Sequence, residues 1–165
     1  MITSEEAVFP NNLVECVALR LGLLDPDLFV TRRPLRETDP NQSIGVFGAL
    51  WTPHQDSLEM KGKLSPGSSE PTFGRYVVTI QAFIKDTDDE RGLATHSVLS
   101  ALIRAILYRD EPLRDLIANL SVEVLGIKEV ARRWGITQQR FLNNELESSW
   151  LFLSSIELWV DTEMM

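Results

Sequence analysis

The chain has 165 residues, a length typical of one domain, and 44% of them are hydrophobic. Its formal net charge of −8 argues against a protein that grips DNA by neutralising phosphates, because that affinity comes from clustered Lys and Arg. The single cysteine, Cys16, excludes an internal disulfide and a cysteine-rich zinc site. No apolar run is long enough for a membrane span, and the acidic start MITSEEAVF is unlike a signal peptide. We therefore expect no membrane partner and folding in a reducing cytoplasm.

The first third of the chain predicts a helix, a connector and a strand. After Asn11 or Asn12 as N-cap, LVECVALRLG places its apolar side chains, Cys16 among them, on one stripe that stops at Gly22. We interpret Cys16 as a plain buried thiol. The proline-rich stretch DPDLFVTRRPLRETDPNQS is typical of a connector, and IGVFGALW is apolar on both faces, which indicates a buried strand.

Residues 52–74 are rich in Pro, Gly and Ser and separate two strands. Loops of this length are uncommon inside compact domains and are usually functional. We therefore predict a long arm that projects from a hairpin.

The second half predicts two long strands around a helical region. RYVVTIQAFIKD alternates strictly, and so does ESSWLFLSSIELWVDTE near the end of the chain. Between them, GLATHSVLSALIRAILYR has helical spacing, LRDLIANL adds a short helix, and SVEVLGIKEVARRW begins like a strand. The order predicts one α+β domain over residues 1–165, with a mostly antiparallel sheet and two main helices packed on one face.

Four carboxylates crowd into Asp86–Glu90 of the stretch IKDTDDERG. A calcium loop that starts at Asp86 would need Gly at its sixth position and Glu at its twelfth, where this chain has Arg91 and Ser97. Asp88 to Glu90 instead stand just before a helix, whose free N–H groups and dipole favour negative charge. The pattern predicts a helix-capping turn whose surface charge is available for contacts.

Other catalytic and metal patterns are also missing. His54 and His96 are the only histidines and lack metal-ligand spacing, so we interpret His96 as structural. Asp56 and Glu59-Met60-Lys61 resemble a nuclease signature, but they stand too close together for residues that must come from adjacent strands. We predict no catalytic, metal or cofactor site, and we do not expect an enzyme.

One stretch, residues 127–144, offers a different class of function. IKEVARRWGITQQRFLNN has helix-turn-helix spacing, with Ala131 in the first helix and Gly135 at the turn. From Lys128 to Arg140 it carries four basic residues and one acid, a net charge of +3. Recognition would fall to Gln138, Gln139 and Asn143. The stretch lies between strand-like segments of an acidic chain, and both facts argue against DNA binding. A DNA-binding regulator is therefore kept only as the less favoured alternative.

A compact acidic domain with a long arm and no catalytic pattern is more typical of a protein that assembles with others than of an enzyme. Trp159 shares a strand face with Glu157 and Asp161, so we expect this tryptophan to be partly exposed, as interface tryptophans often are. The cluster RRPLR is basic. The candidate assembly contacts are Arg32, Arg33, His54, Arg75, Asp88, Asp89, Glu90 and Trp159.

The order of these segments resembles the tail terminator, or tail completion, proteins of long-tailed bacteriophages. The likeness runs through the helix NNLVECVALRLG, the strand DPNQSIGVFGALWTP, the arm, the unit YVVTIQAFIKDTDDERGLATHSVLSALIRAIL and the last strand LFLSSIELWVDT. It implies a homohexameric ring that caps the tail tube, ends its polymerisation and joins the head connector. The implied partners are further copies, the major tail tube protein, a head-closure protein and genomic DNA that passes without specific binding. The implied location is the head–tail junction of the virion, and the alternative within this class is another head–tail connector or neck protein.

Overall fold

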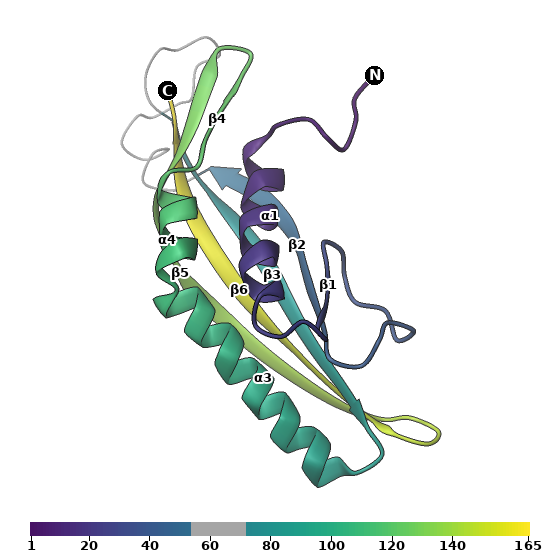
Figure 1. Cartoon of the computed structure of the whole chain (residues 1–165). Helices are drawn as coiled ribbons and strands as arrows, with labels where there is room; N and C mark the ends of the chain where they lie inside the picture. The colour runs from purple at the N-terminus through teal and green to yellow at the C-terminus, as the bar shows by residue number, and fades with distance from the viewer. Residues whose placement is uncertain (54–71) are drawn as a thin grey trace.

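A computed structural model describes residues 1–53 and 72–165, and Figure 1 shows their α+β arrangement. The elements, in chain order, are α1 (Phe9–Gly22), β1 (Phe29–Thr31), β2 (Ser43–Pro53), β3 (Thr72–Asp86), α3 (Asp89–Arg109), α4 (Glu111–Ala118), β4 (Ser121–Val124), β5 (Ile127–Glu145) and β6 (Trp150–Met164). Six strands form one sheet in the order β1-β2-β3-β6-β5-β4. Only β1 and β2 pair in parallel, and all other neighbours are antiparallel.

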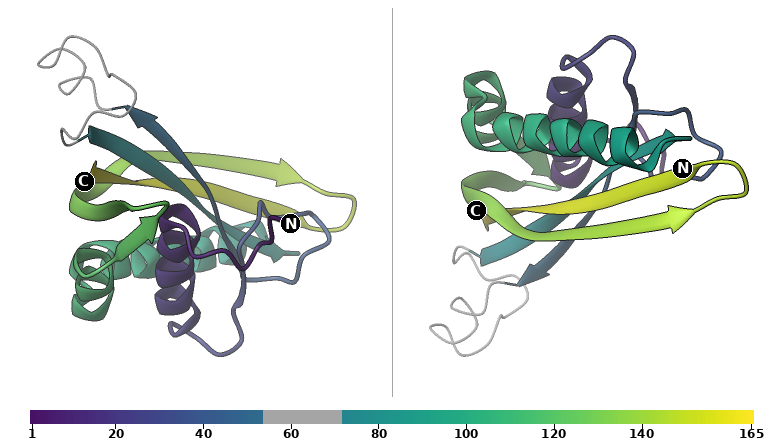
Figure 2. Two further views of the ribbon diagram at one scale, coloured as in Figure 1. Left: turned by 90° about the horizontal axis from the view of Figure 1, so that it is seen from above. Right: turned by 90° about the horizontal axis from the view of Figure 1, so that it is seen from below.

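The helices lie on one face of this sheet, as Figure 2 shows from two opposite sides. The core forms between them and the two central strands, β3 and β6, which pair along their whole lengths. Cross-strand pairs such as Val78–Leu158 and Ile80–Ile156 are fully buried beneath the helices. The predicted α+β class, the mostly antiparallel sheet and the one-sided helices are confirmed.

Helix α1 begins earlier than the sequence pattern predicts. It starts at Phe9 rather than after Asn11 or Asn12, so Pro10 lies in its first turn. Proline suits that turn because its missing N–H has no helical partner to lose. Phe9 is fully buried and stacks on Tyr76 at 5.4 Å between ring centroids, so this packing extends the helix.

The helix-turn-helix interpretation of residues 127–144 is wrong. They form β5, which pairs with β6 from Glu129 to Glu145 in a long hairpin. The alternating apolar residues of β6 offer a full-length partner, and this long-range pairing overrides the local helical spacing. No recognition helix exists there, which removes the basis of the regulator alternative.

Two further expectations need adjustment. The proline-rich connector contains β1, three residues paired in parallel with Ser43–Gly45 of β2. At the predicted arm, β2 extends to Pro53 and β3 begins at Thr72, so both ends of the range 52–74 belong to strands. The rest of the arm lies outside the described residues. Within the described part of the chain, no helix is both long and apolar enough to cross a membrane.

Candidate assembly surface

The sheet face turned away from the helices carries an ion-paired cluster around Trp159. Because side chains alternate along a strand, Trp159 and Asp161 of β6 point to this outer face, opposite the core. Arg75 donates to the Asp161 carboxylate from Nε at 2.6 Å and from Nη2 at 3.2 Å, and Arg133 donates from Nε at 2.7 Å. We call Arg75, Arg133, Trp159 and Asp161 the Trp159 cluster. One carboxylate thus fixes two guanidinium groups that come from the two strands flanking β6.

The Trp159 indole lies close to both of these arginines. The guanidinium of Arg75 is 4.3 Å from the ring centroid and that of Arg133 is 6.0 Å away, both within cation–π range. Gly135 lies directly opposite Trp159 on β5, and a Cβ there would come within 2.7 Å of the indole. The absence of a side chain at Gly135 therefore leaves the space that the Trp159 indole occupies.

The electrostatics of the cluster keep Asp161 charged. Asp161 as a whole residue is only 6% exposed, and burial by itself would raise the pKa of its carboxyl group. The hydrogen bonds from Arg75 and Arg133 outweigh burial, so the pKa lies below its ordinary value. The result is a rigid, charged and aromatic surface. Such Arg and Trp side chains are those that dominate protein–protein contacts.

A second polar group lies on the helix side of the same strands. The Tyr76 hydroxyl donates to Glu129 at 2.9 Å, and the Thr162 hydroxyl donates to the other oxygen of that carboxylate at 2.9 Å. Burial, and then the charge of Glu129, raise the pKa of Tyr76. Tyr76 therefore keeps its proton and serves to tie β3, β5 and β6 together.

The acidic turn before α3 is a capping turn, as predicted. Asp88 is the N-cap, and its side chain accepts from the Arg91 N–H at 3.1 Å. Asp86 binds the Arg91 guanidinium at 2.6 and 2.9 Å, and this pair lowers the pKa of the Asp86 carboxyl. Asp89 and Glu90 are exposed in the first helical turn. The carboxylates thus serve the start of α3, and two of them remain on the surface.

The basic cluster near β1 is engaged within the chain. Arg32 makes a two-pronged pair with Glu15 of α1, with both distances 2.8 Å. Arg33 binds Asp39 at 2.7 and 3.0 Å, and this bond, with the N–H of Arg36, lowers the pKa of Asp39 to about 2. These arginines anchor the connector to the rest of the fold.

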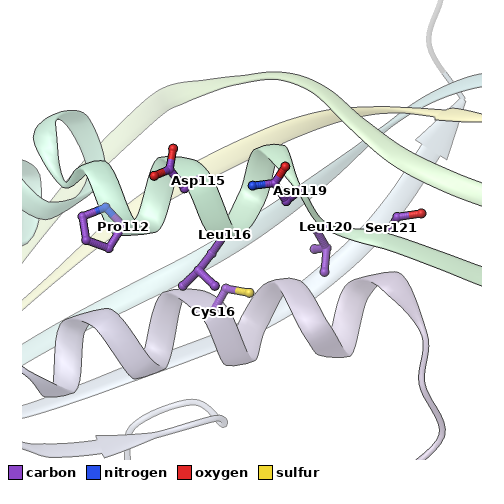
Figure 3. A pocket seen from close by; sticks show the side chains of 7 residues that line it. All are labelled: Cys16, Pro112, Asp115, Leu116, Asn119, Leu120 and Ser121. Atoms are coloured by element: carbon purple, nitrogen blue, oxygen red, sulfur yellow. The ribbon is translucent and has the colours of Figure 1, made fainter.

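His96 and Cys16 have the side chains that most often serve as catalytic groups or metal ligands. In this fold both pack against neighbouring elements. His96 is 4% exposed, with Nε2 2.9 Å from the Ser154 hydroxyl oxygen, and burial lowers its pKa. Cys16 is half-buried rather than fully buried and borders a hollow of about 520 Å³ between α1 and α4. Figure 3 shows the side chain of Cys16 on α1 beside that of Leu116 on α4. Burial raises the pKa of the thiol, which makes it a poor nucleophile.

Of the eight candidate contacts, the structure brings Arg75 and Trp159 together. The turn residues Asp88–Glu90 form their own group, and His54 lies outside the described residues. Sequence reasoning missed Arg133, because the helix-turn-helix interpretation hid its place on β5. Among residues 1–53 and 72–165, no group of His, Cys, Asp and Glu side chains could hold a metal ion.

Comparison with known proteins gives a likeness of fold. No family model matches the chain, and no curated protein matches it. Among solved structures, it is similar to a chain from the virion of a native gene transfer agent particle, with a TM-score of 0.54. The match covers 94% of this chain and 99% of that chain, at 8% sequence identity. The two chains therefore share a fold over most of their lengths.

Proposed function

We propose that this chain is a structural subunit of a phage-like virion. The observation that carries the proposal is the match, over nearly the whole of both chains, to a chain of a gene transfer agent virion. A match of this completeness concerns the entire domain rather than a shared motif. The Trp159 cluster adds support, because it presents ordered Arg and Trp side chains on a sheet face without helices.

Within this class, we propose the role of a tail terminator. A homohexameric ring would cap the tail tube, end polymerisation of the tube protein and offer its other side to the head connector. The order of elements supports this role through the resemblance described above. The net charge of −8 is also suited to a ring through which DNA slides, because carboxylates repel phosphates and leave no strong contacts.

Native mass spectrometry of the purified chain, alone and with tail tubes, tests the ring. We expect a closed hexamer in at least one of the two samples. A stable monomer or dimer in both samples would contradict the terminator proposal.

Another head–tail connector or neck protein is supported by the same virion likeness. Particles assembled without this chain distinguish the two roles. Loss of a terminator leaves tubes of uncontrolled length. Loss of a connector leaves tubes of normal length that carry no heads. Negative-stain length distributions therefore decide between them.

A further inference from the structure

Among the strands that the structure describes, both edges of the sheet are unpaired along much of their length. At one edge, β4 pairs with β5 only from Ile127 to Val130, so no described strand pairs with the outer side of residues 131–145. At the other edge, β1 pairs with β2 only over Ser43–Gly45, which leaves Val46–Pro53 without a described neighbour on that side. An open edge presents backbone N–H and C=O groups whose natural partner is another extended chain.

Residues that pair across neighbouring strands form rows that run from one edge of the sheet to the other, and the unpaired parts of β2 and β5 share several of these rows. Thr52 pairs with Arg75, Arg75 with Asp161, and Asp161 with Arg133, so one row runs from β2 to β5. The open stretch Val46–Pro53 of β2 therefore lies level with residues 131–139 of β5.

Strand direction also continues correctly from one edge to the other. Each neighbouring pair from β2 through β3 and β6 to β5 is antiparallel, so β2 and β5 run in opposite directions. A second copy placed alongside in the same orientation sets its β2 antiparallel to β5 of the first. The antiparallel ladder then crosses the boundary unchanged. Such a head-to-tail contact uses two different surfaces, and its repetition closes into a ring when the rotation between neighbouring copies closes the circle.

The side chains at these edges favour burial by a neighbour. Leu50 on β2 is 74% exposed, and Phe141 and Leu142 on β5 are 49% and 57% exposed. Two basic groups on β5 do not oppose this burial strongly, because Arg132 pairs with Glu163 at 2.5 Å and Arg133 with Asp161. β-Bulges interrupt both edge strands and restrict regular pairing to short stretches, which favours a few registers over uncontrolled stacking.

We propose that copies of this chain join edge to edge, with a stretch within β5 residues 131–145 of one copy pairing antiparallel to Val46–Pro53 of β2 in the next. Six such contacts would make one continuous sheet around a ring. The proposal rests on the proposed function only for the closing of that ring, because the edge contact can be measured by itself.

A cysteine scan tests the contact. In a Cys16→Ser background, one copy carries Leu50→Cys, and a second copy with a different size tag carries one cysteine at successive positions from 131 to 144. Within a single chain the two edges are three strand spacings, about 14 Å, apart, which is too far for an internal disulfide. We expect a single maximum of disulfide formation at the position of β5 that faces residue 50, with weaker cross-linking two residues to either side and none between, because side chains alternate along a strand and a disulfide needs Cα atoms closer than about 7 Å. Uniform or absent cross-linking along β5 would overturn the proposal.

A matched pair of charge variants gives an independent measurement. Leu50→Lys puts a charge at the proposed contact, whereas Val98→Lys puts one at a 60% exposed position on α3. We expect Leu50→Lys to weaken self-association at least about tenfold and Val98→Lys to leave it within about twofold. Hexamers that form equally well with Leu50→Lys would overturn the edge contact while leaving the terminator proposal intact. Monomers of the unmodified chain at every concentration and with tail tubes would overturn both.

Discussion

Asp161 is the residue on which the outer face of the sheet depends. It is buried, it stays ionised, and it holds two arginines from different strands beside Trp159. An isosteric neutral residue would leave two guanidinium groups facing each other without their shared anion. The geometry of the Trp159 cluster therefore follows from one carboxylate.

We expect Asp161→Asn to lower the free energy of unfolding by about 2 kcal/mol, the scale of hydrogen bonds to charged groups. Glu163→Gln is the matched control, because its partner Arg132 is half exposed and such a pair contributes about 1 kcal/mol or less. Urea denaturation followed by tryptophan fluorescence measures both. Equal losses in the two variants would contradict a special role for Asp161.

Asp88 holds the first turn of α3. Replacing it with Ala removes the acceptor for the Arg91 N–H and should lower stability by about 1 kcal/mol. Asp88→Asn keeps an acceptor of similar capping strength and should retain most of that stability. Thermal unfolding by circular dichroism compares the two. A complete loss of folding in Asp88→Ala would mean that the turn does more than cap the helix.

His96 gives the fold a dependence on pH. Burial lowers its folded-state pKa below the ordinary value of 6.5, so the unfolded chain binds the proton first as pH falls. The contribution of neutral His96 to the free energy of unfolding is complete above about pH 6.5. It is lost as the pH falls from there through the folded-state pKa. Stability measured from pH 8 to 5 should therefore decline in the natural chain. His96→Gln should flatten this decline, and His54, present in both proteins, serves as the internal control.

At the scale of elements, strict alternation was enough to predict β3 and β6. A strand with one face under helices must repeat its apolar residues every second position, and both stretches do. Short or irregular elements escaped prediction, because the three residues of β1 carry too little pattern. The failure at β5 has a physical reason. Gly135 matches the turn of a helix-turn-helix, but its real task is to make room for Trp159, 24 residues later in the chain.

The turn between β4 and β5 holds Leu125 in a strained backbone conformation that a substitution can relieve. Leu125 and Gly126 both have positive φ, at 52° and 79°, and Leu125 is 98% exposed. Asn-Gly is the favoured pair in such two-residue turns, so Leu125→Asn should raise the free energy of unfolding by about 0.5–1 kcal/mol. Leu125→Val should lower it, because a β-branched residue tolerates positive φ poorly. Denaturant titration of the three proteins gives the order, and a Val variant as stable as Asn would contradict the turn assignment.

At the scale of the whole molecule, the sequence pattern predicted the fold class but not the arrangement of the Trp159 cluster. Charge and the failed catalytic patterns pointed to assembly, and the element order pointed to a two-layer α+β domain. The Trp159 cluster depends on register between strands up to 86 residues apart, which no local pattern contains. Trp159 and Arg75 were therefore candidates by their own chemistry, and only the pairing of β3, β5 and β6 joined them to Arg133.

The acidic balance leads to a prediction about DNA. Phosphate contacts need cations that are free of protein partners, whereas Arg32, Arg33, Arg75 and Arg133 are all ion-paired within the chain. With a net charge of −8, we expect no electrophoretic shift of duplex DNA at near-physiological salt. Asp161→Asn frees two arginines from their anion and adds one positive unit, so it serves as a sensitised control. A sequence-specific shift by the natural chain would contradict a passive channel for DNA. A weak, salt-sensitive shift confined to the variant would show that ion pairing inside the sheet keeps the surface from binding DNA.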